Sequence, residues 1–569
     1  MGLFRRRAKQ RGEVGHGRGD DFFDQRHMRD LFPVAAFVFL ALSCAAQRLA
    51  LADAYADLPH GPGFRNVRDF GAKGDGVTDD TAAFQRALEE GRGIERAKAA
   101  ANVYVPPGTY VLSDTVMIFR ATLLAGDSEE PPTLLLKEDS PGFGDPLNPK
   151  PLFVTACGYN IDPATRDWKT RTNEIGGSTN NTFYISVRHL NIRLGPGNRG
   201  AWGLYWLVAQ QTALRNVTIE AGDSQGCMKS MWWGGGGVIS HLNLIGGDYG
   251  WYVTQTSQWV MRSCRFTGQR KASLSLHGVW NFALLDLQFE NTAPVETRGG
   301  SVSLLDSQFE GIKSEFAVDS QGGTLVLSNV TTSGVREVVK GMLPAGSEAE
   351  TTVGLWSTGR AMVDGNSLPG ETHDLSELDA IVPRDLPSPA YPMPTANTRS
   401  VTEWGAKGDG ETDDTKAIQR AIDECREVFL PEGTYAVSDT LRLRSNTRLF
   451  GEIWTFIELK EDSPGFQDAG SSKPLLAIPR DSDATVTLCH LWCRTLTPGG
   501  IRTDWRAGEK SMMVDVCFAN YSRTQQVNWR ISGEGGCFSR LPDKLPEPAD
   551  SLLHVRAVEG AGRVFALGL

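Results

Sequence analysis

Seven segments in the first half of the chain share one pattern, with mostly apolar residues two positions apart and polar residues between them. Aligned on each other, they give a column made of Ile192, Ile219, Leu244, Phe266, Phe289, Phe309 and Thr332. A second column lies two residues earlier: Leu190, Val217, Leu242, Cys264, Leu287, Ser307 and Val330. Successive members of the first column are 20 to 27 residues apart. This period indicates a β-solenoid in which each repeat forms one coil and each column stacks along the interior.

A polar column precedes the two apolar ones and consists of His189, Asn216, His241, Ser263, Asp286, Asp306 and Asn329. Its place in the pattern predicts that these residues lie at strand edges or turns. We interpret the column as a polar ladder that hydrogen-bonds from coil to coil, so its histidines are not strong catalytic candidates.

One long stretch of the chain occurs twice. Asn66–Ala87 (NVRDFGAKGDGVTDDTAAFQRA) returns as Ser400–Ala421 (SVTEWGAKGDGETDDTKAIQRA). Two further repeated pairs follow: Val103–Val116 with Val428–Leu441, and Lys137–Phe143 with Lys460–Phe466. Self-similarity over such a distance predicts two tandem domains of the same fold.

The repeated block also predicts its own local structure. Three glycines permit tight turns with positive φ: Gly71, Gly74 and Gly76. Residue types that favour the helix N-cap follow them: Thr78, Asp79 and Asp80. Each copy should therefore open with a strand, a glycine turn and a short capped helix. A calcium loop that includes Asp75 is the alternative, but the EF-hand ligand spacing and closing glutamate are missing.

The paired GAKGDGxTDDT and GTYxxSDT blocks resemble the pectate-lyase-like superfamily of right-handed parallel β-helices. Two copies in one chain are similar to glycoside hydrolase family 55, the exo-β-1,3-glucanases. This resemblance implies an all-β fold of two tandem parallel β-helices with a polysaccharide-binding cleft between them. The same opening block occurs in phage tail spikes and in rhamnogalacturonase-like and epimerase-like proteins, so it specifies the fold better than the function.

The chain divides by composition into four parts. Residues 1–54 form an N-terminal extension and signal peptide, 55–380 a first β-helix, 381–397 a proline-rich linker and 398–569 a shorter second β-helix. Leu31–Ala46 is apolar but short for a membrane span, and the small-x-small sequence Ala52–Ala54 follows it. We expect a secreted or cell-envelope protein, and a start at Met28 would give it a signal peptide of more ordinary length. An uncleaved anchor and a lipid anchor at Cys44 remain alternatives.

Charge and cysteine content narrow the function classes. The net charge is −10, and residues 1–54 are more basic than acidic, so the remainder is more acidic still. This negative net charge argues against nucleic acid as a binding partner and mildly against a polyanionic substrate. Eight of nine cysteines follow the signal region, and we expect them to pack in the core, with one disulfide at most. A zinc site is the alternative for four of them: Cys489, Cys493, Cys517 and Cys537.

The resemblance supplies candidate site residues. Leu204–Asn216 is similar to a family segment in which Gln210 matches a glutamine that positions the attacking water. The family's general-acid glutamate segment is not found, and Asp504 stands where a similar segment carries a glutamate. Nearby acids complete the catalytic candidates: Asp515 and Glu534. The predicted substrate-binding residues are Trp206, Gln211, Trp232, Trp233, Gln255, Gln258 and Trp505.

We therefore expect a glycoside hydrolase that acts on a β-glucan-like chain, as a monomer and without metal or other cofactor. A polysaccharide lyase or epimerase-like enzyme is the second reading. β-Elimination from a uronate needs a base and a cation that neutralises the carboxylate, and three basic residues lie in or beside one coil: Arg262, Arg265 and Lys271. A solenoid that binds glycan without cleaving it is the third. No nucleotide-binding loop or Ser-His-Asp signature appears in the sequence.

Overall fold

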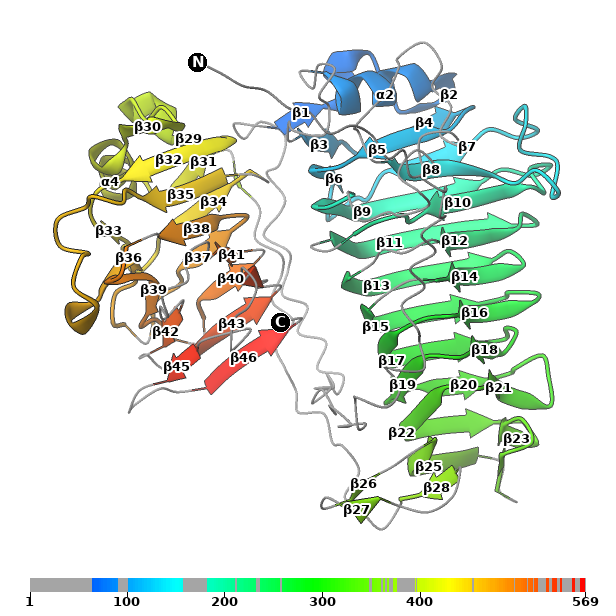
Figure 1. The fold of residues 1–569 in the computed structure, drawn as a ribbon. Helices are drawn as coiled ribbons and strands as arrows, with labels where there is room; N and C mark the ends of the chain where they lie inside the picture. The colour runs from blue at the N-terminus through cyan, green and yellow to red at the C-terminus, as the bar shows by residue number, and fades with distance from the viewer. Residues whose placement is uncertain are drawn as a thin grey trace, which may run out of the picture.

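The computed structural model describes residues 64–90, 101–156, 182–209, 212–231, 236–255, 258–346, 350–359, 362–363, 366–367, 372–375, 394–395, 397–452, 455–481, 483–495, 497–508, 510–514, 516–519, 529–531, 535–539, 543–544, 555–557 and 563–567. In these residues the chain is almost entirely strand and loop (Figure 1). Its α-helices are α2 (Thr81–Glu89) and α4 (Thr415–Glu424), and short 3₁₀ helices span Val67–Phe70, Val401–Trp404 and Ala469–Ser471. The predicted all-β solenoid is confirmed.

Strands β1 to β28 form a first solenoid with two large sheets. The sixteen-stranded sheet runs in the order β1 (Phe64–Asn66), β3 (Ala101–Val105), β6 (Thr122–Gly126), β9 (Ile185–Leu194), β11 (Thr212–Gly222), β13 (Gly237–Gly246), β15 (Gln258–Thr267), β17 (Asn281–Glu290), β19 (Ser301–Leu305), β22 (Thr324–Ser333), β25 (Glu350–Thr358) and β28 (Thr372–Asp374), joined by β2 (Asp75–Asp79), β4 (Thr109–Leu112), β7 (Thr133–Leu136) and β20 (Gln308–Glu310). The ten-stranded sheet runs in the order β24 (Leu343–Pro344), β23 (Glu337–Val339), β21 (Phe316–Gln321), β18 (Val295–Arg298), β16 (Ala272–His277), β14 (Tyr249–Thr254), β12 (Gly226–Ser230), β10 (Ala201–Tyr205), β8 (Lys150–Ala156) and β5 (Val116–Phe119).

Pairing in this solenoid is parallel from coil to coil until its last strands. β25 and β28 are antiparallel to their neighbours, as is β24, and β26 (Met362–Val363) and β27 (Asn366–Ser367) form a small hairpin beyond them. These antiparallel strands satisfy the backbone N–H and C=O groups at the end of the parallel stack, which could otherwise pair with another chain.

Strands β29 to β46 form a second, smaller solenoid with three sheets (Figure 1). The first contains β29 (Arg399–Ser400), β31 (Glu427–Leu430), β34 (Arg448–Gly451), β37 (Thr487–Cys489), β40 (Met512–Val514), β43 (Gly535–Ser539) and β46 (Arg563–Leu567). The second contains β30 (Asp409–Asp413), β32 (Gly433–Val437), β35 (Thr455–Leu459), β38 (Trp492–Thr495), β41 (Cys517–Ala519) and β44 (Asp543–Lys544). The third contains β33 (Leu441–Arg442), β36 (Lys473–Ala477), β39 (Gly500–Trp505), β42 (Trp529–Ile531) and β45 (Val555–Ala557).

The interior of the first solenoid is built from the predicted columns. The strand register pairs Ile192 with Ile219, and it continues along the column through Leu244, Phe266, Phe289, Phe309 and Thr332. All seven side chains are buried. Phe289 stacks on Phe266 and on Phe309, with ring centroids 5.0 and 4.4 Å apart. The prediction of one coil per repeat is confirmed.

The predicted polar column occupies a bend within the long strands. All seven of its residues have φ between 47° and 55°, the left-handed region, and so does His490 in the second solenoid. Asn, Asp and His tolerate this conformation better than other non-glycine residues. Two coil-to-coil hydrogen bonds follow the predicted ladder: Ser263 Oγ donates to Asp286 Oδ2 (2.8 Å), and Asn329 Nδ2 donates to Asp306 Oδ1 (2.7 Å).

The repeated opening block has the same hydrogen bonds in both copies. The Asp80 carboxylate accepts the backbone N–H groups of Lys73 and Gly74 (2.7 and 3.0 Å), and Asp414 accepts the matching pair (2.8 and 3.0 Å). Asp80 is the N-cap residue of α2, yet its side chain holds the glycine turn instead of the helix. The neighbouring Asp79 accepts the first N–H of the helix, from Thr81 (3.0 Å). The predicted capping role therefore belongs to Asp79.

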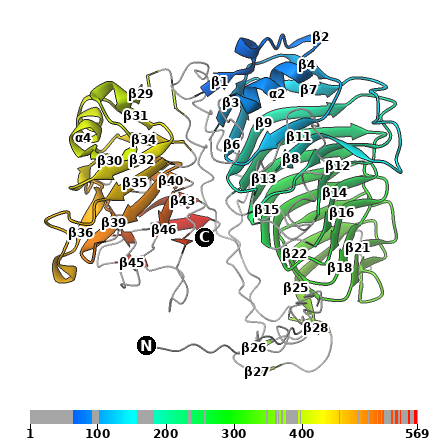
Figure 2. The same cartoon turned by 45° about the horizontal axis from the view of Figure 1, so that its top comes forward.

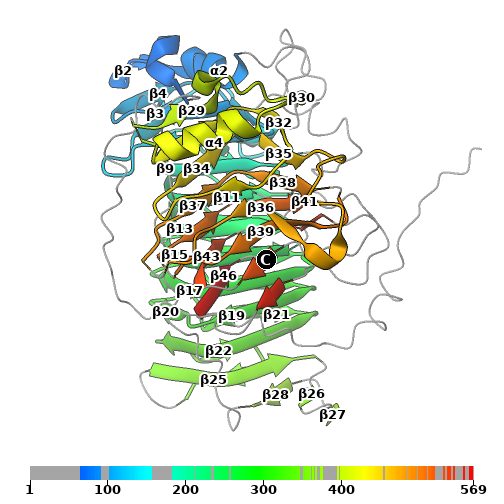
Figure 3. The same cartoon turned by 90° about the vertical axis from the view of Figure 1, so that its left-hand side faces the viewer.

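The two solenoids contact each other through equivalent faces. Tyr104 and Ala125 of the first pack against Phe429 and Phe450 of the second, which stand at the matching positions of the repeat. A second contact brings Trp492 against Tyr184, with ring centroids 5.5 Å apart. Both α-helices cover the same end of their stacks (Figures 2 and 3). The arrangement resembles a twofold dimer interface made within one chain. The exact domain boundaries stay a prediction.

The cysteines of the described residues agree with core packing. Cys227, Cys264, Cys425, Cys489 and Cys493 are free thiols, and all but Cys425 are buried. Burial raises the pKa of Cys227, Cys264 and Cys493 to about 12, which keeps them protonated. Cys489 lies at the contact between the solenoids, whereas Cys493 lies in the core of the second, so these two do not share a zinc site.

Candidate functional site

Asp504, the leading catalytic candidate, lies on β39 of the second solenoid. Its side chain is only 2% exposed, and its Oδ2 accepts hydrogen bonds from Nη2 and Nε of Arg506 at 2.6 and 3.0 Å. Two charge-assisted hydrogen bonds from one guanidinium to the same carboxylate oxygen form a strong contact. Arg506 therefore holds the Asp504 carboxylate in one position.

The remaining predicted residues fall into three groups, of which two tryptophans are the last. Six lie outside the described residues: Gln210, Gln211, Trp232, Trp233, Asp515 and Glu534. Gln255 and Gln258 are described and exposed, the first just after β14 and the second at the start of β15.

The structure does not support a substrate-stacking role for the two described tryptophans of the set. Trp505 is fully buried in the core of the second solenoid, and Trp206 is 1% exposed in the core of the first. The interior of each solenoid accommodates the large apolar indole, so neither ring offers a face to a ligand. Sequence reasoning could not separate these tryptophans from surface ones, because Trp206 directly follows β10 and Trp505 ends β39, where the alternation of inward and outward positions stops.

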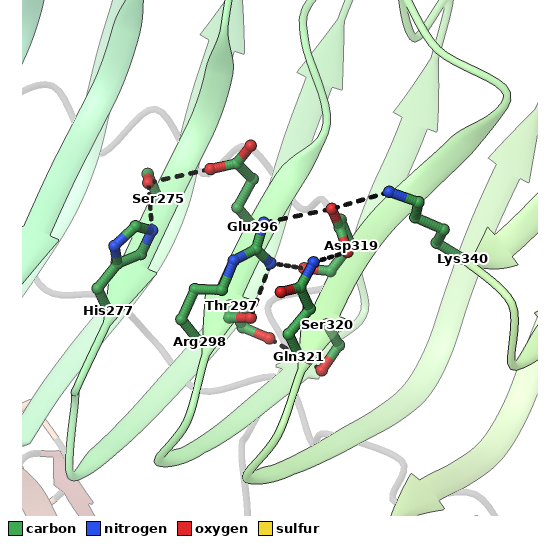
Figure 4. A network of polar contacts seen from close by, with 9 residues as sticks. All are labelled: Ser275, His277, Glu296, Thr297, Arg298, Asp319, Ser320, Gln321 and Lys340. Carbon is green, nitrogen blue, oxygen red and sulfur yellow. Dashed lines mark hydrogen bonds and ion pairs between the residues drawn. The ribbon is translucent and has the colours of Figure 1, made fainter.

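The structure instead gathers reactive side chains on the outer face of the ten-stranded sheet (Figure 4). Register aligns one outward row along neighbouring strands: Tyr205, Lys229, Tyr252, Ser275, Glu296 and Asp319. A second row, two residues further along each strand, contains Thr254, His277, Arg298 and Gln321. We call these two rows the polar face.

Asp319 is the centre of the charged end of the polar face. Its Oδ2 lies 3.3 Å from both Arg298 Nη2 and Lys340 Nζ, and Gln321 Nε2 donates to its Oδ1 at 3.4 Å. Burial alone would raise the pKa of Asp319, but Lys340 and Arg298 outweigh it and hold the pKa below its usual value. Asp319 is therefore ionised at neutral pH.

Glu296 sits beside Asp319 in a different environment. Its Oε2 accepts a hydrogen bond from Ser275 Oγ (3.3 Å), and the same hydroxyl lies 3.1 Å from His277 Nε2 (Figure 4). Burial lowers the pKa of His277, which keeps the imidazole neutral near pH 7, although Glu296 opposes the shift. Two carboxylates therefore lie on adjacent strands, one bound by cations and the other by a hydroxyl.

The other end of the polar face is aromatic. Lys229 Nζ lies 5.6, 5.5 and 5.7 Å from the ring centroids of Trp202, Tyr205 and Tyr252. Burial lowers the pKa of Lys229, and the faces of the rings compensate part of its lost hydration. Trp202 also stacks on Tyr249, with centroids 6.0 Å apart and planes 13° from parallel. This end is a packed wall beside the carboxylates.

Sequence reasoning missed the polar face because its residues carry no motif. Outward positions alternate with core positions, so the apolar columns do mark them, but acidic residues are common at the outward positions of any strand that faces solvent. Within the described part of the chain, no group of three His, Cys, Asp or Glu side chains could hold a metal ion. No helix in that part is long and apolar enough to cross a membrane.

A family model supplies the decisive comparison. The model described as "Rhamnogalacturonase A/epimerase, pectate lyase-like" matches residues 64–294 and 398–473, together more than half of the chain. The chain belongs to this family. The two matched regions begin at the two copies of the repeated block, so this pectate-lyase-like chain carries the family's opening twice.

Curated relatives extend the similarity beyond the family model. The chain is 29% identical to the non-secreted LysM effector LysM15 of Penicillium expansum, over 70% of this chain but only 30% of the effector. It is 26% identical to a probable glucan endo-1,3-beta-glucosidase of Arthroderma benhamiae, over 88% of this chain and 70% of the relative. It is also 26% identical to a glucan 1,3-beta-glucosidase of Cochliobolus carbonum, over 88% and 66%.

Among solved structures, sacteLam55A from Streptomyces sp. SirexAA-E aligns with 86% of this pectate-lyase-like chain and 81% of its own length. The identity is 13% and the TM-score 0.34, so this likeness carries no argument about function.

Proposed function

We propose that this protein is a glycoside hydrolase that acts on a neutral β-1,3-linked glucan. The observation that carries the proposal is the alignment with two proteins named as glucan 1,3-beta-glucosidases, each over 88% of the chain. A match of that length must include parts of both solenoids. The polar face adds what hydrolysis of a glycosidic bond requires, since the reaction needs a carboxylic acid and a carboxylate near one another.

The structure offers two sets of carboxylates for this chemistry. Asp504 is the candidate taken from the family resemblance, and its contact with Arg506 holds the carboxylate in place. Glu296 and Asp319 form the alternative set on the polar face, at paired positions of adjacent strands. Backbones of neighbouring strands are about 4.8 Å apart, so both side chains of this pair can reach one sugar.

Lyase or epimerase activity on an acidic glycan is the second candidate, because the family description names an epimerase. The basic residues expected to serve it are occupied. Arg265 pairs with Glu290 (2.9 Å) and Lys271 with Asp248 (2.8 Å), while Arg262 is only 9% exposed. Cations already neutralised by the protein bind a uronate weakly, which favours a neutral substrate.

A glycan panel tests the proposal. The purified protein is incubated with laminarin, other neutral glucans, pectin, rhamnogalacturonan and alginate, and reducing ends and ultraviolet absorbance of unsaturated uronates are read together. Reducing ends from laminarin without that absorbance support the hydrolase. A rise in the ultraviolet absorbance of unsaturated uronates on a uronate polymer would refute the hydrolase proposal and show a lyase. Retention on a glycan gel without any product would make the protein a binding solenoid.

Matched variants then separate the two carboxylate sets. Glu296→Gln and Asp319→Asn remove one ionisable group each from the polar face, and Asp504→Asn does the same in the second solenoid. Loss of about 100-fold or more in kcat on laminarin marks the set that performs the chemistry. We also propose that the protein is exported, and N-terminal sequencing of the mature protein, with cleavage expected after Ala54, tests this.

A further inference from the structure

The first solenoid exposes one large aromatic side chain in the turns that lead from the ten-stranded to the sixteen-stranded sheet. Trp280 is 50% exposed, and of the four markedly exposed large apolar residues in the described part of the chain it is the aromatic one. Seven other described tryptophans are at most 4% exposed: Trp202, Trp206, Trp251, Trp259, Trp356, Trp492 and Trp505. Tryptophan is one of the residue types enriched where proteins bind other molecules.

The backbone fixes Trp280 in this outward position. It follows β16 and directly precedes β17, and the residue before it, Val279, is buried in the core. Gly278 turns the chain with φ of 61°, and the carbonyl of Trp280 accepts the N–H of Ser301 from the next coil (3.1 Å). The indole is therefore carried by a rigid turn rather than by a loose loop.

Three exposed carboxamide residues occupy the same column of turns as this tryptophan, in its own coil or in the preceding one. Gln258, the first residue of β15, pairs in register with Asn281, the residue directly after Trp280, and both side chains are exposed. Gln255 lies in the same turn column as Gly278, since its N–H donates to the carbonyl of His277 (2.9 Å). Amides both donate and accept hydrogen bonds, as sugar hydroxyls require.

Gln255 occupies a left-handed backbone position that favours glycine. Its φ is 53°, whereas the equivalent turn positions in the next coils are Gly278, Gly299 and Gly322. Glycine adopts this conformation freely, and a glutamine does so with strain. A strained side chain that points to solvent has no packing role to explain it, so a contact outside the protein is the better explanation.

We propose that Trp280, Gln255, Gln258 and Asn281 form a subsite that binds a neutral sugar ring of a glycan. The indole stacks on the apolar C–H face of the ring, and the three carboxamides bind its hydroxyls. None of the four side chains carries a charge. The nearby Arg298 is held by Asp319 and by backbone carbonyls, so the subsite selects a neutral ring over a uronate. This subsite rests on the proposed function and names its substrate class.

The test measures affinity and stability together, with the full-length protein. Trp280→Ala should weaken laminarin binding by about tenfold in affinity gels or calorimetry, and Trp280→Phe by less. The matched control is Met342→Ala, which removes another exposed apolar side chain (42% exposed) and should leave binding unchanged. Gln255→Gly should weaken binding while the protein becomes no less stable, a combination that a merely structural role does not produce.

Each outcome decides between the subsite and the function. If wild-type protein cleaves laminarin but Trp280→Ala keeps its affinity and KM, the subsite is wrong and the hydrolase stands. Weaker binding to polygalacturonate than to laminarin supports the neutral selectivity, and the reverse order overturns it. Absence of both binding and cleavage on every neutral glucan overturns the proposed function and the subsite together.

Discussion

His189 makes the stability of the first solenoid depend on pH. It lies in the left-handed bend of β9 and is only 6% exposed. Burial, reinforced by the positive charge of Arg188, lowers its pKa from 6.5 to about 4, while Asp127 opposes the shift. The perturbation is His189→Asn, because Asn216 and Asn329 already occupy the same bend in other coils. The exchange removes the titrating group and keeps a residue suited to the backbone.

The magnitude follows from the difference between the folded and unfolded states. The folded-state pKa is the lower one, so the unfolded chain takes up the proton first as the pH falls. The contribution of neutral His189 to the free energy of unfolding is fully present above pH 6.5 and is lost as the pH falls toward 4. Between pH 7 and pH 5 the loss amounts to about 2 kcal/mol in the free energy of unfolding. The asparagine variant should lack this part of the loss.

Urea unfolding at pH 7, 6 and 5, followed by tryptophan fluorescence, measures the difference. At pH 7 the two proteins should be close in stability, and at pH 5 the variant should be the more stable one relative to its own value at pH 7. Asn216→Gly is the control, since it alters the same column without removing a titrating group. It should change the free energy of unfolding by the same amount at every pH. Parallel pH dependence of wild type and His189→Asn would refute the reasoning.

Three further perturbations probe the fold. Phe289→Ala opens the middle of the phenylalanine stack and should lower stability by about 3–5 kcal/mol in urea unfolding; a loss below 1 kcal/mol would contradict a rigid core column. Asp80→Ala and Asp414→Ala each leave two backbone N–H groups unbound, so each should cost roughly 2–3 kcal/mol, and a large difference between them would show that the two copies are not energetically equivalent. Trp492→Ala weakens the contact between the solenoids and should increase proteolysis between them, whereas an unchanged digestion pattern would argue against that contact.

The interior of the fold could be read from the sequence. The columns through Phe266 and Cys264 identify buried positions because a strand alternates sides and a solenoid repeats at nearly constant length. The sequence places the polar column at strand edges or turns, and the structure shows a left-handed bend that lies inside a strand for six of its residues and between β19 and β20 for Asp306. The sequence offered Thr78, Asp79 and Asp80 as capping residues without choosing among them, because a carboxylate next to both a helix and a glycine turn can bind either, and only the path of the chain decides.

The candidate site was harder to predict. Asp504 lay in a segment similar to a family motif, but its ion pair with Arg506 depends on how β39 is buried. Glu296 and Asp319 are 23 residues apart and carry no motif, yet the coil length places them side by side. Trp206 and Trp280 look alike as sequence, and one is buried while the other is half exposed.

The sequence by itself determined the duplication, the solenoid class and the core columns, because these depend on local periodicity and on side-chain polarity. The tertiary structure alone decided which outward residues meet, which tryptophans reach solvent and how the two solenoids pack. Those outcomes depend on the length of every coil and on the exact turn between sheets. A change of one residue in a turn moves a side chain to another row, and such shifts leave the hydrophobic pattern almost unchanged.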